Sequence, residues 1–134
     1  MLQPKKEKYR KQFRGKRRGM ATRGNTLAFG DYGLKATTCG WVSSRQLEAA
    51  RKKITFSTKR MGQYWLRAFP HKPVSAKPVG VKMGSGKGDI DRHVAVVKPG
   101  MIIYEIGGVS EEIARSALTK AGHKLSVRTI IVSK

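Results

Sequence analysis

The chain has few acidic residues, a single cysteine and no long apolar run. Its 134 residues hold 8 Asp and Glu against 29 Lys and Arg, which gives a net charge of +21 at pH 7. The lone Cys39 excludes a disulfide framework and a cysteine-rich zinc site. The three histidines share no metal-ligand spacing, so we expect no metal and no other cofactor. No apolar run approaches the roughly 20 residues of a spanning helix, so we expect no membrane partner.

The most pronounced feature of the composition is the excess of positive charge. A folded domain with this imbalance repels itself unless a polyanion neutralises it. Nucleic acid is the leading candidate and a membrane surface the second, but the basic stretches lack the apolar face that a membrane would bind. The length and the 39% hydrophobic fraction predict one domain, residues 1–134, with a real core.

Residues 1–23 are predicted to form a basic extension. Glu7 is its one acid, Tyr9 and Phe13 are interleaved, and Gly15 and Gly19 interrupt any helix. Such an arm should become ordered only against a polyanion. A solvated tail is one alternative, and an Arg-rich transit peptide is another, although serine and an amphipathic stripe are lacking. Its candidate RNA-binding residues are Lys5, Lys6, Lys8, Arg10, Lys11, Arg14, Lys16, Arg17 and Arg18.

Residues 43–59 carry the clearest helix signal. Ser43 as N-cap and Gln46 three residues later make a capping box, and Leu47, Ala50 and Ile54 form a narrow apolar stripe. The remaining surface is basic, which favours an RNA-facing helix over a merely solvated one. Its candidate RNA-binding residues are Arg45, Arg51, Lys52 and Lys59.

A second helix is predicted from N-cap Ser110 to Gly122. Glu111 and Glu112 in its first turn suit the positive end of the helix dipole, and Ile113, Ala117, Leu118 and Ala121 are its predicted buried face. The predicted strands lie at residues 26–38 (two short strands around Gly30-Asp31), 64–69, 93–97, 101–106 and 127–132. Two helices among several strands predict an α+β domain.

Residues 70–89 are predicted to be a long functional loop carried by the folded body. Prolines, glycines and regularly spaced lysines replace any periodicity, and loops of this length are usually functional or disordered. Glycine lets the backbone approach a phosphate closely, and lysine supplies the counter-charge. The candidate contact residues are Lys77, Lys82, Met83, Gly84, Ser85, Gly86, Lys87 and Gly88.

This glycine-lysine segment does not fit a nucleotide-binding loop. A Walker loop needs glycine where Val81 stands and Ser or Thr where Gly88 stands. Asp89 and Asp91 lie beside Arg92 and His93, where local ion pairing is the better interpretation. We therefore expect that the protein is not an enzyme. The alternative, a phosphate-handling enzyme, would require the isolated protein to bind magnesium-nucleotide.

Several motifs occur in order along the chain: MLQPKK at 1–6, FRGKRRG at 13–19, SRQLEAAR at 44–51, KMGSGKG at 82–88, VKPG at 97–100 and YEIGGV at 104–109. On these residues the chain resembles the large-subunit ribosomal protein sixteen family of the bacterial and organellar type over essentially its whole length. The resemblance implies an α+β sandwich of α/β-hammerhead type, with two helices against a mixed or antiparallel sheet. It also implies a structural constituent of the large ribosomal subunit.

The resemblance further implies partners. They are the large-subunit ribosomal RNA near the peptidyl-transferase region, the transfer RNA in the aminoacyl site and neighbouring large-subunit proteins. The transfer RNA in the peptidyl site is a further candidate. No homo-oligomer is expected. The arm (residues 5–18) and the first helix match RNA-contacting parts, and residues 82–88 match the loop directed at transfer RNA. The expected location is the ribosome, in the bacterial cytoplasm by preference or in an organelle matrix. A free RNA-binding protein is the competing hypothesis, and co-sedimentation with the large subunit separates the two.

Some positions depart from the family pattern. Lys82 stands where bacterial relatives usually have Arg, and His71 where they usually have Asp. The pair Arg92-His93 replaces a common Tyr-Trp pair, which puts local packing at this point in question.

Overall fold

The computed structural model describes residues 2–134; Met1, the first residue of the predicted extension and of the first motif, lies outside the described residues. The helices are α1 (Ser44–Thr58) and α2 (Glu111–Gly122). The strands are β1 (Tyr32–Ala36), β2 (Gly40–Ser43), β3 (Gln63–Leu66), β4 (Lys72–Ala76), β5 (Asp89–Val97), β6 (Ile102–Gly107) and β7 (Thr129–Ser133). The predicted α+β class is confirmed.

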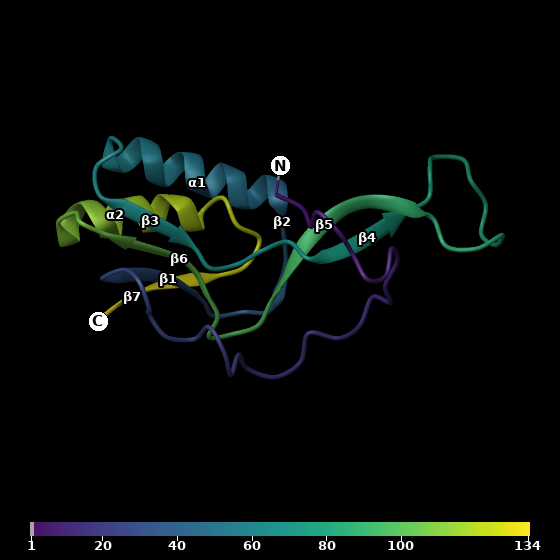
Figure 1. The fold of residues 1–134 in the computed structure, drawn as a ribbon, viewed down its shortest axis with the longest axis horizontal. Coiled ribbons are helices and arrows are strands. Elements are labelled where there is room, and N and C mark those ends of the chain that lie inside the picture. Colours follow the sequence, from purple (N-terminus) through teal and green to yellow (C-terminus); the bar gives the residue numbers. More distant parts are fainter. Residues whose placement is uncertain (1) are drawn as a thin grey trace.

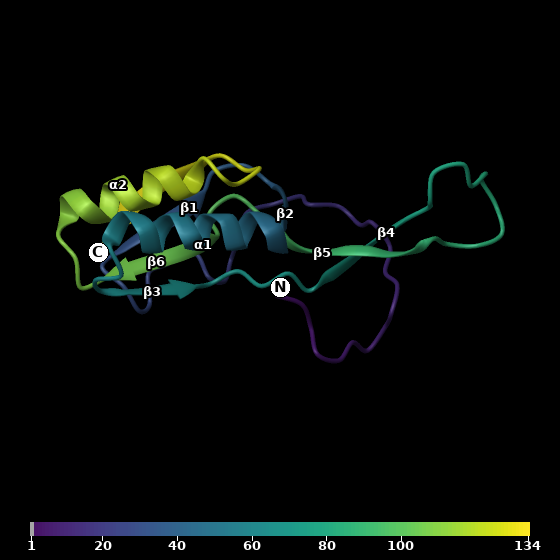
Figure 2. The same cartoon turned by 90° about the horizontal axis from the view of Figure 1, so that it is seen from above.

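The strands form two antiparallel sheets. One has the order β3-β6-β1-β7 and the other the order β2-β5-β4. Helices α1 and α2 lie side by side over one face of the four-stranded sheet (Figures 1 and 2). The sheets are antiparallel rather than mixed, and the arrangement is consistent with the implied α/β-hammerhead sandwich.

Helix α1 begins where the capping box predicts. The amide of Gln46 donates to Ser43 Oγ at 3.2 Å, and the Ser43 amide donates back to Gln46 Oε1 at 3.0 Å. The predicted stripe of Leu47, Ala50 and Ile54 is buried. The helix ends where Lys59 takes a left-handed conformation, with φ of 53°.

Strand β6 is buried along its whole length at the centre of the four-stranded sheet. Because side chains alternate along a strand, Tyr104 and Glu105 point to opposite faces. The Tyr104 hydroxyl donates to the Leu47 carbonyl of α1 at 2.7 Å. Glu105 therefore faces away from the helices, yet it is also 0% exposed, because other residues cover that face.

The chain segment over that second face corrects one prediction. Of the two short strands predicted in residues 26–38, only β1 forms, since the preceding amides find a carboxylate instead of a neighbouring strand. The amides of Ala28, Phe29 and Gly30 each donate to Glu105 Oε1 at 3.0 Å. A Cβ at Gly30 would lie 2.6 Å from the Ile106 carbonyl oxygen, so only glycine permits this approach.

Other strand predictions also differ from the structure, and the three largest differences concern β2, β3 and β5. Strand β2 was not predicted, because a four-residue segment that begins with glycine carries little signal on its own. Strand β3 ends at Leu66 rather than at residue 69. Strand β5 begins at Asp89 rather than at residue 93, because it pairs with β2 on one side and with β4 on the other.

The predicted loop over residues 70–89 is shorter in the structure. Strand β4 occupies Lys72–Ala76 and contains Pro73, which lacks a backbone donor. Proline is tolerated there because β4 is an edge strand, paired with β5 alone. The loop proper is residues 77–88.

Helix α2 ends at Gly122 as predicted, but this glycine does not cap the helix. The capping residue, His123, has φ of −66°, so no left-handed glycine closes this helix. A Cβ at Gly122 would lie 2.6 Å from Thr129 Oγ1, so glycine permits close packing of α2 against the sheet. The predicted buried face is confirmed at Ala117, Leu118 and Ala121; Ala114 is fully buried, and Ile113 only partly.

Candidate nucleic-acid interface

The hairpin of β4 and β5 projects from the body and carries loop 77–88 at its far end (Figures 1 and 2). Gly84, Ser85 and Gly86 all have left-handed backbones, with φ of 103°, 64° and 96°. Adding a Cβ to either glycine would meet no atom within 4 Å, so this stretch of backbone is open to a ligand. Lys82, Lys87 and Met83 are exposed on the same loop.

Lys77, one of the predicted contact residues, points into its own loop. Its ammonium donates to the Gly84 carbonyl at 2.7 Å and reaches the Lys82 carbonyl at 3.5 Å. Lys77 therefore supports the shape of the loop, while Lys82 and Lys87 present their charges outward.

The arm runs along the hairpin. Lys11 Nζ donates to the Lys87 carbonyl at 3.0 Å, and Lys72 Nζ donates to the Phe13 carbonyl at 2.6 Å. Nearer the start, Glu7 Oε1 lies 2.5 Å from His93 Nε2 of β5. These contacts bring two of the predicted basic surfaces, the arm and the base of the loop, into one continuous surface.

Trp41 of β2 is a residue of this surface that sequence reasoning missed. The guanidinium groups of Arg14 and Arg17 lie 5.5 and 4.9 Å from its ring centroids, within cation–π range. The Trp41 indole Nε1 is buried and has no hydrogen-bond partner among the described residues. No local pattern links a tryptophan to arginines more than twenty positions earlier, so only the fold reveals the contact.

The exposed face of α1 forms the second basic surface. Arg45, Lys52 and Lys59 are exposed as predicted. Arg51 is half-buried and holds Glu48 at 2.5 Å, and this hydrogen bond keeps the pKa of Glu48 below its ordinary value. The charge of Arg51 is thus partly neutralised by Glu48 within the helix, whereas the other three cations are exposed to solvent.

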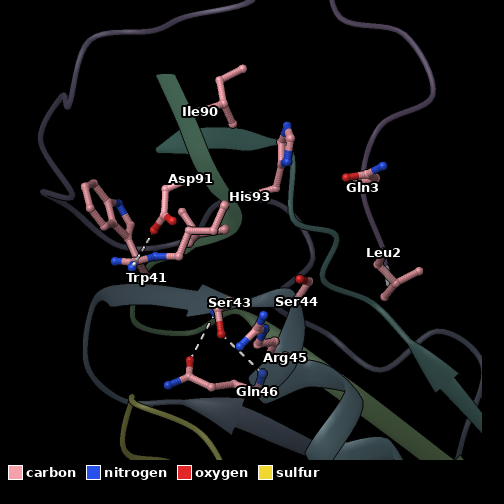
Figure 3. A pocket seen from close by; sticks show the side chains of 12 residues that line it. Leu2, Gln3, Trp41, Ser43, Ser44, Arg45, Gln46, Ile90, Asp91 and His93 are labelled. Carbon is pink, nitrogen blue, oxygen red and sulfur yellow. Dashed lines mark hydrogen bonds and ion pairs between the residues drawn. The ribbon is translucent and has the colours of Figure 1, made fainter. Parts of the chain in front are cut away.

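A polar cleft of about 720 Å³ separates the start of α1 from the arm and β5 (Figure 3). Ser44 and Arg45 line it from the helix, Leu2 and Gln3 from the arm, and Ile90 to Val94 from the strand. Asp91 lies 3.5 Å from Arg92, and a bulge in β5 lies at this point of the β4–β5 ladder. The cleft therefore contains both signs of charge.

Three of the four positions that depart from the family pattern contact another side chain. Arg92 contacts Asp91, and His93 contacts Glu7 of the arm. The ring of His71 lies 4.7 Å from that of Phe69. His93 thus helps to hold the arm on the hairpin, whereas Arg92 pairs within β5.

Two absences hold for residues 2–134. They contain no group of three or more His, Cys, Asp or Glu side chains placed to hold a metal ion. No helix in the same range is long and apolar enough to cross a membrane.

A small α+β body that carries a cationic arm, a cationic helix face and a projecting glycine-lysine loop belongs to the class of basic RNA-associated proteins. Residues 4–132 match the family model of ribosomal protein L16p/L10e. The chain belongs to this family and is a structural constituent of the large ribosomal subunit. The resemblance stated from the sequence motifs is therefore confirmed, and the ribosome is the location it implies.

Proposed function

We propose that the arm and α1 bind large-subunit ribosomal RNA near the peptidyl-transferase region. In support, the arm and α1 together present exposed cations with few acids nearby, and phosphate contacts provide most of the affinity of such surfaces. Neighbouring large-subunit proteins complete the surroundings, and no self-association is involved. The preferred compartment is the bacterial cytoplasm, with an organelle matrix as the alternative.

Loop 77–88 has a separate role in this proposal: contact with the transfer RNA in the aminoacyl site, and with that in the peptidyl site as a further candidate. The observation that supports it best is position. The loop lies at the far end of a projecting hairpin, with open left-handed backbone at Gly84 and Gly86 and outward cations at Lys82 and Lys87. A loop so placed can contact a second RNA while the body stays on the first.

The experiment is to delete residues 81–88 and measure transfer-RNA affinity on purified ribosomes. The segment contributes no residue to the core, and shortening a loop changes the closure free energy by only about 0.6 kcal/mol per halving. We expect the variant to fold, to enter the large subunit and to lose affinity for transfer RNA in the aminoacyl site. A matched control replaces the same residues with glycine and serine, which keeps the length and removes the cations.

The control variant should lose part of the affinity, because it keeps the loop length and an open glycine backbone but removes the cations, whereas the deletion removes both. Wild-type affinity together with wild-type peptide-bond formation in the deletion variant would reduce the loop to a spacer.

A further inference from the structure

Phe56 is an aromatic side chain exposed on the basic face of α1. Its side chain is 77% exposed, and it lies outside the buried stripe of Leu47, Ala50 and Ile54. A single exposed apolar residue needs no explanation by itself. The surroundings of Phe56 are what make it informative.

Cations surround the Phe56 ring. Lys53 Nζ lies 5.3 Å from the ring centroid. A shallow hollow of about 460 Å³ adjoins the ring, and besides Phe56 its walls are Arg51, Lys52, Thr55, Lys59 and Arg60. The hollow thus has an aromatic wall beside cationic walls, and no acidic residue lines it.

The backbone at the end of α1 places two of these cations. Lys59 and Arg60 are both left-handed, with φ of 53° and 62°. Where a helix ends on a left-handed residue, that residue is usually glycine, because a residue with a side chain is strained in this conformation. The turn is held by the Arg60 amide, which donates to the Thr55 carbonyl at 3.1 Å. Two basic side chains therefore occupy strained positions and line the same hollow as Phe56.

We propose that this hollow binds one unpaired nucleotide of ribosomal RNA, with the base stacked on Phe56 and the flanking phosphates on Lys52, Lys59 and Arg60. This inference rests on the proposed RNA-binding role of α1. Aromatic rings combined with cations are the means by which proteins hold single-stranded nucleic acid. A base within a duplex is already stacked on both faces and cannot reach the ring, so the site selects unpaired RNA.

The test compares Phe56→Leu and Phe56→Trp with wild type, using the full chain. The probes are a single-stranded oligouridylate and an RNA duplex of equal length. Leucine keeps an apolar side chain and removes the ring, whereas tryptophan enlarges the stacking surface. Kd is measured for each pair over a series of salt concentrations.

We expect Phe56→Leu to weaken single-strand binding by about fivefold to tenfold, the effect of losing one stacked base at an exposed site. The slope of log Kd against log salt should not change, because no phosphate contact is lost. Phe56→Leu should bind the duplex with the wild-type Kd, and Phe56→Trp should bind the single strand at least as tightly as wild type.

Equal single-strand Kd values for wild type and Phe56→Leu would overturn the inference while leaving RNA binding by α1 intact. An equal loss on both RNAs would also overturn it, because the ring would then have no preference for unpaired bases. Wild-type protein that binds neither RNA would overturn the proposed function, and this inference with it.

Discussion

Replacing Glu105 with Gln should destabilise the fold more than any other single change of charge in the described chain. Glu105 is 0% exposed and accepts three backbone hydrogen bonds from Ala28, Phe29 and Gly30. Its second oxygen forms an ion pair with Arg67 of the chain after β3. One carboxylate thus attaches the segment before β1 to the centre of the four-stranded sheet.

The magnitude follows from these contacts. Hydrogen bonds to a charged acceptor contribute about 1 kcal/mol more each than those to a neutral one. Glutamine would also direct its amide group at the Arg67 guanidinium, and breaking a buried pair costs about 3–5 kcal/mol. These costs do not add within one network, and the Arg67 side chain is 20% exposed and can turn toward water. We therefore take the lower end of the range and expect Glu105→Gln to lower the free energy of unfolding by about 3 kcal/mol, a large part of the total for a domain of this size.

The effect should depend on pH. Burial alone would raise the pKa of Glu105, but the Arg67 guanidinium and the three amides outweigh it and hold the pKa below its ordinary value of 4.5. A carboxyl whose pKa is lowered on folding stabilises the fold fully above its unfolded pKa, and the contribution is lost as the pH falls through the folded value. The difference between wild type and Glu105→Gln should therefore be full near neutral pH and shrink below about pH 4.5.

Urea unfolding near neutral pH and at about pH 3.5 measures both effects. A shift of about 3 kcal/mol should move the urea midpoint by about 1.5 M, given the usual slopes. The matched control is Glu111→Gln, because the Glu111–Arg115 pair on α2 is exposed and should contribute less than about 1 kcal/mol. A loss no greater than that of the control, or one independent of pH, would refute this account of Glu105.

Two further predictions concern the basic surfaces. Replacing Arg51, Lys52 and Lys59 together with Gln should flatten the salt dependence of RNA binding by about 0.9 per lost duplex phosphate contact, with stability nearly unchanged. The single change Lys120→Gln on α2 should leave the slope as it is, and an unchanged slope in the triple variant would mean that the α1 face is only solvated. In the free protein, backbone relaxation should show fast motion in the residues before Ala21. The Ala21 amide, which donates to the Pro99 carbonyl, makes the first backbone hydrogen bond between the arm and the body. A rigid arm without RNA would contradict this prediction.

The elements that sequence alone predicted correctly are those whose signals lie within a few residues. The capping box of Ser43 and Gln46 and the stripe of Leu47, Ala50 and Ile54 locate α1 completely. Strand β6 was equally predictable from the sequence, because a short apolar run after a Lys-Pro-Gly turn is typical of a buried strand. The identity of the cations in each candidate surface was also accessible, because it needs only a count of charges.

The remainder depends on contacts between distant residues. Strand β4 was hidden by Pro73, which argues against a strand unless the segment is known to lie at a sheet edge. The segment before β1 has strand-like composition, but its amides bind Glu105, which lies some 75 positions away in the sequence. Likewise, no local signal shows that Lys77 turns inward or that Arg14 and Arg17 contact Trp41.

The few acidic residues show how the charge is organised. Among the described residues, four of the eight form ion pairs with arginine and a fifth, Glu7, contacts His93; each contact lies where it fixes a local geometry. The paired acids are Glu48 in α1, Asp91 at the bulge of β5, Glu105 in β6 and Glu111 in α2, and Glu7 lies in the arm. Only four of the 29 Lys and Arg take part in these pairs, so the chain does not neutralise itself.

This distribution implies an order of events in assembly. The apolar core and the Glu105 contacts involve residues of the body alone, so the body can fold before any RNA is present. The arm before Ala21 contacts the hairpin through side-chain hydrogen bonds and β2 through cation–π contacts. In water these contacts contribute little, and they must offset the entropy lost when a flexible, strongly charged segment is ordered. RNA bound to the arm as proposed above would supply the missing counter-charge, since a ligand that binds only the ordered arm stabilises it by mass action. The arm should therefore take its final position on the ribosomal RNA that we propose it binds, after the body that carries it has formed.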